Sequence, residues 1–411
     1  MSGDLSGLLE LMGRALRAIK GRGGPVVLVY HDDADGITSA AIAAALLERL
    51  GLEGGRVCLE KAYPQALEMV HERAEGGSVV YVDIGSPHAK LIHELSERHG
   101  TLAVILDHHD APNYQAEGLF NINPEFFGFD GERDASGSTV TYLFAKAAWK
   151  GAAEHSGLAL VGSYEIPGPV RGLNELVLSD ALEARTAKVV GGDILVRAAS
   201  GYVSRRKLSK ALTILGSVGY YKGGPELGVR ACLEGFPEGA MEEAKRYEEM
   251  RRAANRRLLS KLARTGLKTG EYVQWFKDSG IFSGMGGKVI GTFCSYLAYR
   301  GRLVDQSKYL VGFMEVSPEI PGLGRLPSRL SKFSVRTPDK LREMVRAGKR
   351  PPASQVSVRA AQELGGFADG HAFAASGVVP LGREDELAER IDAAVSAAVG
   401  RGRKSSITDF L

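Results

Sequence analysis

The sequence predicts an α/β protein with an N-terminal parallel-sheet domain, a helical connector and a smaller C-terminal α/β domain. Over residues 1–150, short apolar runs rich in β-branched residues alternate with helical patterns. Such runs are typical of strands buried on both faces, and their alternation with helices indicates a parallel sheet covered by helices. The expected strands lie at 25–30, 56–60, 78–83 and 102–107.

A mostly helical stretch follows, and then strands return. The clearest helical patterns lie at 139–152 and 242–264, and the later strands at 272–276, 309–316 and 332–336. The pattern at 242–264 is rich in Arg, Lys and Glu, which fits either a solvated helix face or a face turned to nucleic acid. We expect these boundaries: first domain 1–190, connector 191–270, second domain 271–400, flexible tail 401–411.

Composition excludes several classes of protein. The 411 residues carry a net charge of only +3, so any argument for a nucleic-acid partner has to rest on local basic patches. The three cysteines form no CxxC pair, which indicates neither a disulfide framework nor a zinc cluster and suits a reducing, cytoplasmic compartment. We find no signal-peptide pattern and no run of about 18 apolar residues, and therefore expect no membrane span.

Polar side chains stand directly after three of the expected strands. The segments concerned are His31–Gly36, Asp83–Gly85 and Asp107–His109. Because parallel strands end at the same edge of a sheet, we expect all three segments to meet in one crevice. A lone D-x-D-G is often a turn or a helix cap, and a lone strand-end Asp is often an N-cap, but three such segments in equivalent positions indicate a common site.

The residue types in these segments indicate a metal site. Clustered carboxylates repel one another unless cations neutralise them or protons are taken up. Carboxylate and imidazole without thiolate suit Mn, Mg, Fe or Zn, and the oxygen-rich mixture favours Mn or Mg. Two such ions would clamp a phosphate and generate a hydroxide nucleophile, so we expect attack of that hydroxide on a phosphodiester.

On these residues the chain resembles the DHH phosphoesterase superfamily. Residues 31–39 (HDDADGITS) resemble its first motif, Asp83 stands at the second, and Asp107-His108-His109 is the third, which names the family. The resemblance implies a phosphoesterase that uses one or two Mn²⁺ ions, with Mg²⁺ as an alternative. It implies the metal ligands Asp33, Asp35, Asp83 and His108.

The resemblance also assigns roles near the reacting phosphate. His109 would contact the scissile phosphate, and Asp107 would orient the histidine pair. His31 stands where many archaeal members keep a histidine, and either a role in the site or a buried capping role is open.

The fourth motif departs from the family pattern. The family places an Asp shortly after a hydrophobic-Gly strand, whereas the matching stretch here, 158–168 (LALVGSYEIPG), has none. Glu165 is the nearby carboxylate and the expected substitute ligand. Asp180, inside a helical pattern, is the other candidate.

The C-terminal part resembles the DHHA1 substrate-binding domain, which faces the DHH site across a cleft. The stretch 365–377 (GGFADGHAFAASG) fits its G-G-H pattern at Gly370 and His371, although Asp369 replaces one glycine. Residues 334–336 (SVR) resemble its S-x-R strand, so Arg336 would grip a phosphate through two parallel hydrogen bonds. Arg359 is a weaker candidate for the same task.

Two further stretches favour a polymeric substrate. Residues 325–350 are strongly basic, which suits a phosphate backbone or simply a solvated surface. Residues 212–235 are similar to a stretch of archaeal RecJ-like proteins. The resemblance thus implies an exonuclease of DNA repair or replication that degrades single-stranded DNA or RNA, with GINS or a repair helicase as partner. A nanoRNA, pAp or cyclic-dinucleotide phosphodiesterase and a non-catalytic replisome or repair scaffold are the alternatives.

The last residues resemble a clamp-binding peptide of the PIP-box kind. Such peptides place an aliphatic residue three positions before an aromatic pair on one helical turn. Ile407, Phe410 and Leu411 fit this pattern and imply a sliding clamp (PCNA) as partner. A frayed tail with chance apolar residues is the alternative.

Overall fold

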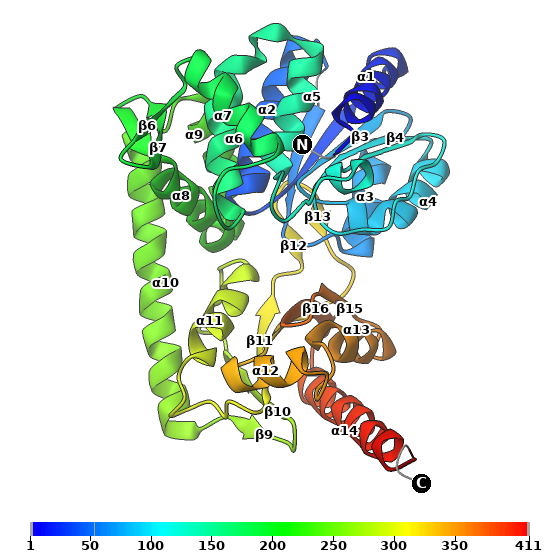
Figure 1. Ribbon diagram of the computed structural model, residues 1–411, viewed down its shortest axis with the longest axis vertical. Coiled ribbons are helices and arrows are strands. Elements are labelled where there is room, and N and C mark those ends of the chain that lie inside the picture. Colours follow the sequence, from blue (N-terminus) through cyan, green and yellow to red (C-terminus); the bar gives the residue numbers. More distant parts are fainter. Residues whose placement is uncertain (1–2, 53, 409–411) are drawn as a thin grey trace. The chain divides into compact units, whose positions relative to one another are not determined.

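A five-stranded parallel sheet forms the centre of the N-terminal half of the protein in the computed structural model (Figure 1). The structure describes residues 3–52 and 54–408, and from residue 401 on it describes the backbone only. The strand order is β2-β1-β3-β4-β5, and every neighbouring pair is parallel. The strands are β1 (Val26–His31), β2 (Gly54–Leu59), β3 (Ser78–Val82), β4 (Leu102–Leu106) and β5 (Leu119–Ile122). The predicted sheet is confirmed, and the short strand β5 was not predicted.

Helices cover both faces of this sheet, and further helices pack on these in an outer layer. They are α1 (Leu5–Arg22), α2 (Ala34–Arg49), α3 (Pro64–Arg73), α4 (Ala89–His99), α5 (Gly137–Ala148), α6 (Ser156–Gly162), α7 (Leu173–Glu183), α8 (Arg205–Val218) and α9 (Gly224–Leu233). Helix α2 is rich in alanine and buried along most of its length, which lets α5, α6, α8 and α9 pack against it.

The strand order determines where a ligand site lies. The chain runs from β1 to β2 at one edge and then returns past β1 to β3 and β4. Because β-α-β crossovers are right-handed, α2 covers one face of the sheet, and α3 and α4 cover the other. The change of direction falls between β1 and β3, and parallel sheets bind ligands outside the carboxyl ends of strands at such a point.

The first of two compact units comprises Met1–Tyr247 and Glu319–Arg325, so the units divide within the 28-residue helix α10 (Glu238–Thr265). Most of the expected connector therefore groups with the first domain, because α8 and α9 pack on α2. The first unit also holds two small antiparallel sheets. Their strands are β6 (Ala187–Val190), β7 (Asp193–Ala198), β8 (Gly201–Ser204), β12 (Glu319–Ile320) and β13 (Gly324–Arg325).

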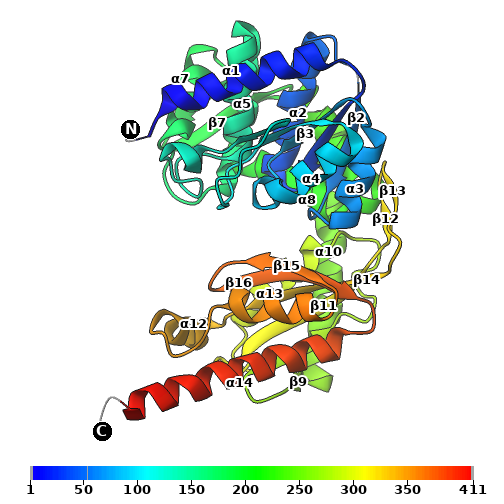
Figure 2. The ribbon, with the colours of Figure 1, turned by 90° about the vertical axis from the view of Figure 1, so that its right-hand side faces the viewer.

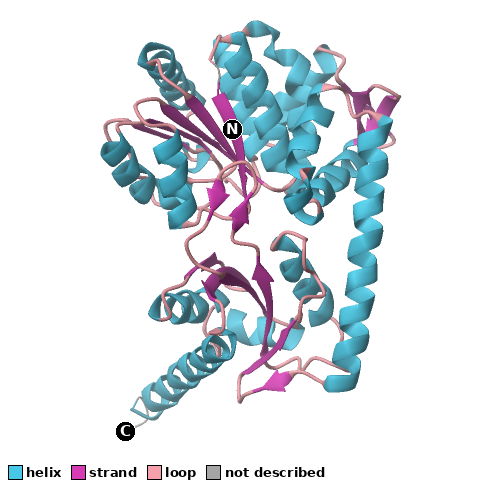
Figure 3. Cartoon of the chain, turned by 180° about the vertical axis from the view of Figure 1, so that it is seen from behind, coloured by secondary structure: helices cyan, strands magenta, loops and turns pink. Residues whose placement is uncertain are grey.

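The second unit is built on a six-stranded mixed sheet in the order β15-β16-β14-β11-β10-β9 (Figure 3). Only β10 and β11 pair in parallel, and the other neighbours are antiparallel. The strands are β9 (Lys268–Thr269), β10 (Val273–Lys277), β11 (Tyr309–Val316), β14 (Leu330–Arg336), β15 (Phe367–Gly370) and β16 (Ala374–Pro380). The predicted second α/β domain is thereby confirmed.

Helices cover this sheet as well. They are α11 (Lys288–Ala298), α12 (Asp339–Arg346), α13 (Ala353–Glu363) and α14 (Glu384–Thr408). Helices α13 and α14 pack together on one side of the sheet (Figure 2), where Trp275, Phe313 and Phe333 form part of a continuous apolar core. Helix α11 packs on β11 and β14.

The C-terminal residues continue helix α14. Its backbone is helical through Thr408, so Ile407 of the predicted clamp-binding peptide lies in its last turn. Phe410 and Leu411 lie outside the described residues. The clamp, GINS and helicase partners stay predictions.

Two expectations from composition can be compared with the structure. All three cysteines are buried and unbonded to one another. Among the described helices, none is long and apolar enough to cross a membrane.

A fully buried histidine joins α3 to the sheet. The His71 ring lies with Nδ1 2.7 Å from Thr101 Oγ1 and Nε2 2.9 Å from Tyr81 Oη. Burial lowers the pKa of His71 to about 4. The imidazole is therefore neutral in the folded protein at neutral pH.

This network predicts acid sensitivity. Because the pKa of His71 is lower in the folded than in the unfolded state, the unfolded state takes up the proton first, and stability is lost as pH falls from about 6.5 towards 4. The loss should approach about 3 kcal/mol, at 1.4 kcal/mol for each pKa unit. Thermal unfolding of wild type and His71→Gln between pH 7 and 4.5 should show a flatter pH dependence in the variant. His93→Gln, in α4, is the control and should keep the wild-type slope; equal slopes in all three proteins would contradict the assignment.

Candidate metal centre

The polar ends of three neighbouring strands meet at the carboxyl edge of the parallel sheet. They form two overlapping groups whose potential ligand atoms lie within 4.8 Å of one another. The groups are Asp83, His108 and His109, and His31, Asp33 and Asp83. Asp83 at the end of the middle strand, β3, is common to both, as the strand order β1-β3-β4 requires.

Asp83 carries a buried carboxylate without a hydrogen-bond partner. Its residue is only 2% exposed, and neither carboxylate oxygen meets a donor in the described part of the chain. Burial, and then the neighbouring carboxylates, raises the pKa of Asp83 well above its usual range. Its φ of 59° is rare for a residue other than glycine, and such strain concentrates at functional sites. A buried charge of this kind requires a proton or a cation.

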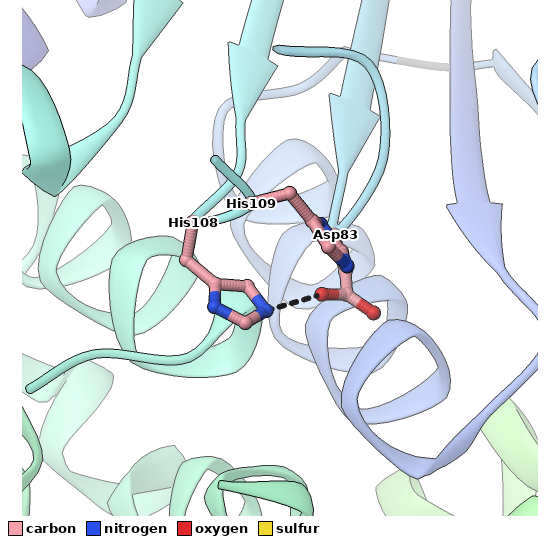
Figure 4. A group of neighbouring side chains, drawn as sticks. All are labelled: Asp83, His108 and His109. Atoms are coloured by element: carbon pink, nitrogen blue, oxygen red, sulfur yellow. Dashed lines mark ion pairs between the residues drawn. The ribbon is translucent and has the colours of Figure 1, made fainter. Parts of the chain in front are cut away.

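His108 is oriented as a metal ligand. Its Nδ1 lies 2.7 Å from the Gly131 carbonyl oxygen and so carries the hydrogen. The Nε2 lone pair then faces the Asp83 carboxylate at 3.4 Å (Figure 4). Burial lowers the pKa of His108, so the ring is neutral. A lone pair and a carboxylate at this distance repel each other unless a cation lies between them, and this donor set fits Mn²⁺ or Mg²⁺.

Asp107 positions the two histidines through hydrogen bonds to His108 and His109. Its Oδ2 accepts from the Ser86 N–H at 2.9 Å, and its Oδ1 accepts from the His108 N–H at 2.8 Å. The same Oδ1 lies 2.6 Å from Nδ1 of His109. Although burial opposes ionisation, His109 holds the pKa of Asp107 well below its usual range.

His109 carries a positive charge at neutral pH. Desolvation of its ring opposes protonation, but Asp107 outweighs this effect and raises the pKa of His109 to about 9. The side chain is 48% exposed, in contrast to the buried His108. The charged imidazole can therefore reach an anion that enters the site.

The first motif surrounds the His31 ring with carboxylates. The ring's Nδ1 lies 2.9 Å from Asp33 Oδ2, and its Nε2 lies 3.3 Å from Asp32 Oδ1. Asp33, rather than His31, caps α2, accepting from the Gly36 N–H at 3.1 Å. Asp32 is fully buried, and neither of its oxygens meets a hydrogen-bond donor among the described residues. No motif gives Asp32 a role, although its place directly after a buried strand is a signal for one.

Asp35 is anchored at the N-terminus of helix α5. Its two oxygens accept from the N–H groups of Gly137 and Ser138, each at 2.8 Å. The helix end favours negative charge there. Asp35 Oδ2 lies 3.7 Å from His108 Nε2, so this carboxylate borders the centre.

The two candidates for the fourth motif lie outside the two groups. Glu165, exposed at the end of a 3₁₀ turn (Ser163–Glu165), accepts from the Thr213 hydroxyl at 2.7 Å. That hydroxyl accepts from the Ala34 N–H at the start of α2, so Glu165 is one hydrogen-bonded residue away from the first motif. Asp180 in α7 accepts from Tyr142 Oη at 2.8 Å and from Lys146 at 2.5 Å, which gives it a structural role.

In the second unit, Arg336 and the Gly370–His371 turn lie at one edge of the sheet. Arg336 pairs with Ala374 and Gly370 with Ala375, both on β16. The Arg336 guanidinium donates to Ser295 Oγ at 2.9 Å and to Ser334 Oγ at 2.7 Å. It also donates to the Val335 carbonyl oxygen at 2.8 Å, and among the described residues no ion pair with a carboxylate is found for this half-buried guanidinium. The exposed His371 lies beside it.

The other basic residues differ in how far they are neutralised. Arg359 pairs with Glu363 in a groove between α13 and α14 and is not at this edge. In the 325–350 run, Arg329 pairs with Glu315, whereas Arg342 and Arg346 lie over the Phe373 ring. On α10, Glu248 pairs with two arginines. Further cations of this helix line a surface hollow without a carboxylate partner among the described residues, namely Arg256, Arg257, Lys261 and Arg264.

Comparison with known proteins identifies the class. The family model described as "DHH family, N-terminal domain" matches residues 25–162, which contain the first three motifs. The first unit therefore contains a DHH domain, the domain of a metal-dependent phosphoesterase superfamily, and the predicted resemblance is confirmed.

Individual relatives extend over more of the chain. An uncharacterized protein of Methanocaldococcus jannaschii is 23% identical over 429 residues, covering 92% of this chain and 95% of the relative. The Mn²⁺ complex of RecJ from Thermus thermophilus superposes with a TM-score of 0.64 at 18% identity over 97% of this chain, which spans only 56% of that RecJ. A manganese-bound exonuclease RecJ gives 0.62 at 17% identity, with 96% and 95% covered. The fold is thus RecJ-like.

The unpartnered Asp83 carboxylate predicts a metal-dependent gain of stability. Free Mn²⁺ at about 100 times its Kd should stabilise the wild type by about 3 kcal/mol. Asp83→Asn should lose this gain and should unfold in EDTA at no lower temperature than the wild type, because the amide replaces a buried acid that has no hydrogen-bond donor among the described residues. Thermal unfolding across a Mn²⁺ titration measures both effects. Asp110→Asn, an exposed acid beside the third motif, is the matched control; a full Mn²⁺ response in Asp83→Asn would count against the site.

Proposed function

We propose that the chain is a divalent-metal-dependent phosphodiesterase that works as a RecJ-like exonuclease on single-stranded DNA or RNA. The observation that carries this proposal is Asp83, a buried carboxylate without a hydrogen-bond donor among the described residues, shared by two groups of potential ligands. The match to the DHH family and the RecJ-like fold support it.

The proposed metal ligands are Asp33, Asp35, Asp83 and His108, with Glu165 as the substitute for the fourth motif. Asp83 would serve two ions jointly, since it belongs to both groups. Mn²⁺ or Mg²⁺ bound there would polarise a phosphate and activate water for attack on the terminal phosphodiester.

The chain's own side chains would bind and orient the substrate. The charged His109 ring would donate to an oxygen of the scissile phosphate, and Asp107 would keep that ring in place. In the second unit, the Arg336 guanidinium would hold another phosphate, with His371 as a further donor. Separate phosphate contacts of this kind suit a polymer better than a mononucleotide.

Strand-cleavage assays test the proposal. Single-stranded DNA and RNA labelled at either end should be shortened in Mn²⁺ and left intact in EDTA. Asp83→Asn and His108→Ala should lower the rate by about 100-fold or more, since each removes a group that positions charge at the reacting phosphate. Asp110→Asn should retain the wild-type rate. Intact DNA and RNA from both ends would refute the exonuclease, and turnover of dinucleotides alone would favour the small-substrate alternative.

The fourth motif gives a separate prediction. Glu165→Gln should raise the Mn²⁺ concentration for half-maximal activity by about 10- to 100-fold, the range seen when a metal ligand or its immediate partner is altered. Asp180→Asn, which lies in α7 and bonds to Tyr142, should leave that concentration unchanged. Identical Mn²⁺ dependence in Glu165→Gln and the wild type would remove Glu165 from the site.

A non-catalytic scaffold is the second candidate, and the position of Glu165 outside the two ligand groups favours it. The metal content of the purified protein separates the two functions. An enzyme should retain or rebind stoichiometric Mn²⁺, and a scaffold should not.

A further inference from the structure

Tyr299, at the C-terminal end of α11, presents an aromatic ring to solvent. The residue is 66% exposed, and in the described part of the chain no ring, cation or hydrogen-bond partner is found for its side chain. The neighbouring Tyr296 differs, because the Arg300 guanidinium covers its ring at 4.7 Å from the centroid. Tyr299 therefore has a ring face open to a ligand.

The register of α11 places Tyr299 in line with the Arg336 site. Gly291 and Ser295 both border the guanidinium: a Cβ at Gly291 would lie 3.1 Å from Arg336 Nη2, and Ser295 Oγ accepts from Arg336 Nε at 2.9 Å. Residues four apart on a helix stack on one face, about 5–6 Å apart. Tyr299 is the next member of this series and is the C-cap of α11, directly after the last helical residue, Ala298.

The surroundings of this stripe favour an anionic ligand. Between Lys288 and Val304 the sequence contains no acidic residue, and Arg300 and Arg302 follow Tyr299 closely in the chain. The Arg336 guanidinium has no carboxylate partner among the described residues. The Arg336 guanidinium, a cationic site for one phosphate, is thus bordered by Ser295, and the neutral ring of Tyr299 stands one helical turn further along α11. A nucleotide carries a phosphate and a planar base at a comparable spacing.

We propose that Tyr299 is a stacking platform for the base of the nucleotide whose phosphate Arg336 holds. The inference rests on the proposed function and names a residue that binds a base of its single-stranded substrate, since a base must be unstacked to lie on the ring. Stacking of this kind is tolerant of sequence, because every base has a π-face. Tyr299 is a binding residue, and it acts on affinity rather than on the chemical step.

Binding without cleavage tests the platform. Fluorescence anisotropy of a labelled single-stranded oligonucleotide with the full chain in EDTA measures affinity while no strand is cut. Tyr299→Ala should weaken binding about tenfold, within the range of alanine substitutions at stacking residues, and Tyr299→Phe should bind within about twofold of the wild type. Tyr202→Ala is the matched control, because Tyr202 is 37% exposed but lies in the first unit under Lys188 at 4.4 Å.

An abasic strand separates stacking from a general structural effect. On an oligonucleotide of the same length that carries sugar and phosphate alone, Tyr299→Ala should bind as tightly as the wild type, whereas Arg336→Gln should bind both strands more weakly. Equal affinity of Tyr299→Ala and wild type for the base-carrying strand would overturn the proposal, as would an equal loss on the abasic strand.

Failure of the Tyr299 stacking proposal can be distinguished from failure of the proposed exonuclease activity. A wild-type chain that binds strands through Tyr299 but never cuts them in Mn²⁺ upholds the platform and refutes the nuclease. A chain that binds neither strand overturns both.

Discussion

Buried negative charge at the carboxyl edge of the parallel sheet is the constraint around which the first unit is arranged. Each carboxylate there, apart from those of Asp32 and Asp83, is stabilised by a neighbour: Asp35 by the N-terminus of α5, and Asp107 by His109 and backbone N–H groups. Asp33 is stabilised as the cap of α2. Of these two acids, Asp83 stands where the two groups of ligands overlap, and a cation bound there would take the place of the proton that its buried carboxyl otherwise needs.

The helices pack closely enough to serve these carboxylates because glycines stand at the points of contact. A Cβ at Gly137 would lie 2.4 Å from Asp83 Oδ1, and one at Gly162 would lie 2.6 Å from Asp35 Oδ1. Glycine at both positions lets the backbone of α5 and α6 approach the acids. Packing and electrostatics thus depend on the same residues, and a small side chain at either point would disturb both.

The candidate sites of the two units differ in the sign of their charge. The first unit offers acids and imidazoles suited to divalent ions, and the second offers the guanidinium of Arg336 held by two serine hydroxyls. This difference has a chemical reason, because a reacting phosphate needs cations that polarise it, whereas a phosphate that is only held needs fixed hydrogen-bond donors. Under the proposal made above, Tyr299 would add a contact to the base, which neither kind of charge can supply.

Much of the fold and of the site could be predicted from local sequence. Continuous apolar runs predicted four strands of the first sheet, and their polar ends predicted that His31, Asp83 and His108 would meet, because parallel strands share a carboxyl edge. The second α/β domain was also predicted from its strand patterns, whereas Arg336 and His371 were indicated by the family resemblance. These features depend on residues that are close together in the chain or on a repeated geometry.

The partners of each charged group could not be predicted, because they come from distant parts of the chain. Asp35 is held by Gly137 and Ser138, about 100 residues away, and Glu165 is bound by Thr213. No local pattern encodes such contacts, which is why the sequence did not indicate Asp32 or Tyr299. Strand ends and ligand types are thus properties of the sequence, whereas which acid remains without a partner, and which aromatic ring remains uncovered, depends on how distant segments pack.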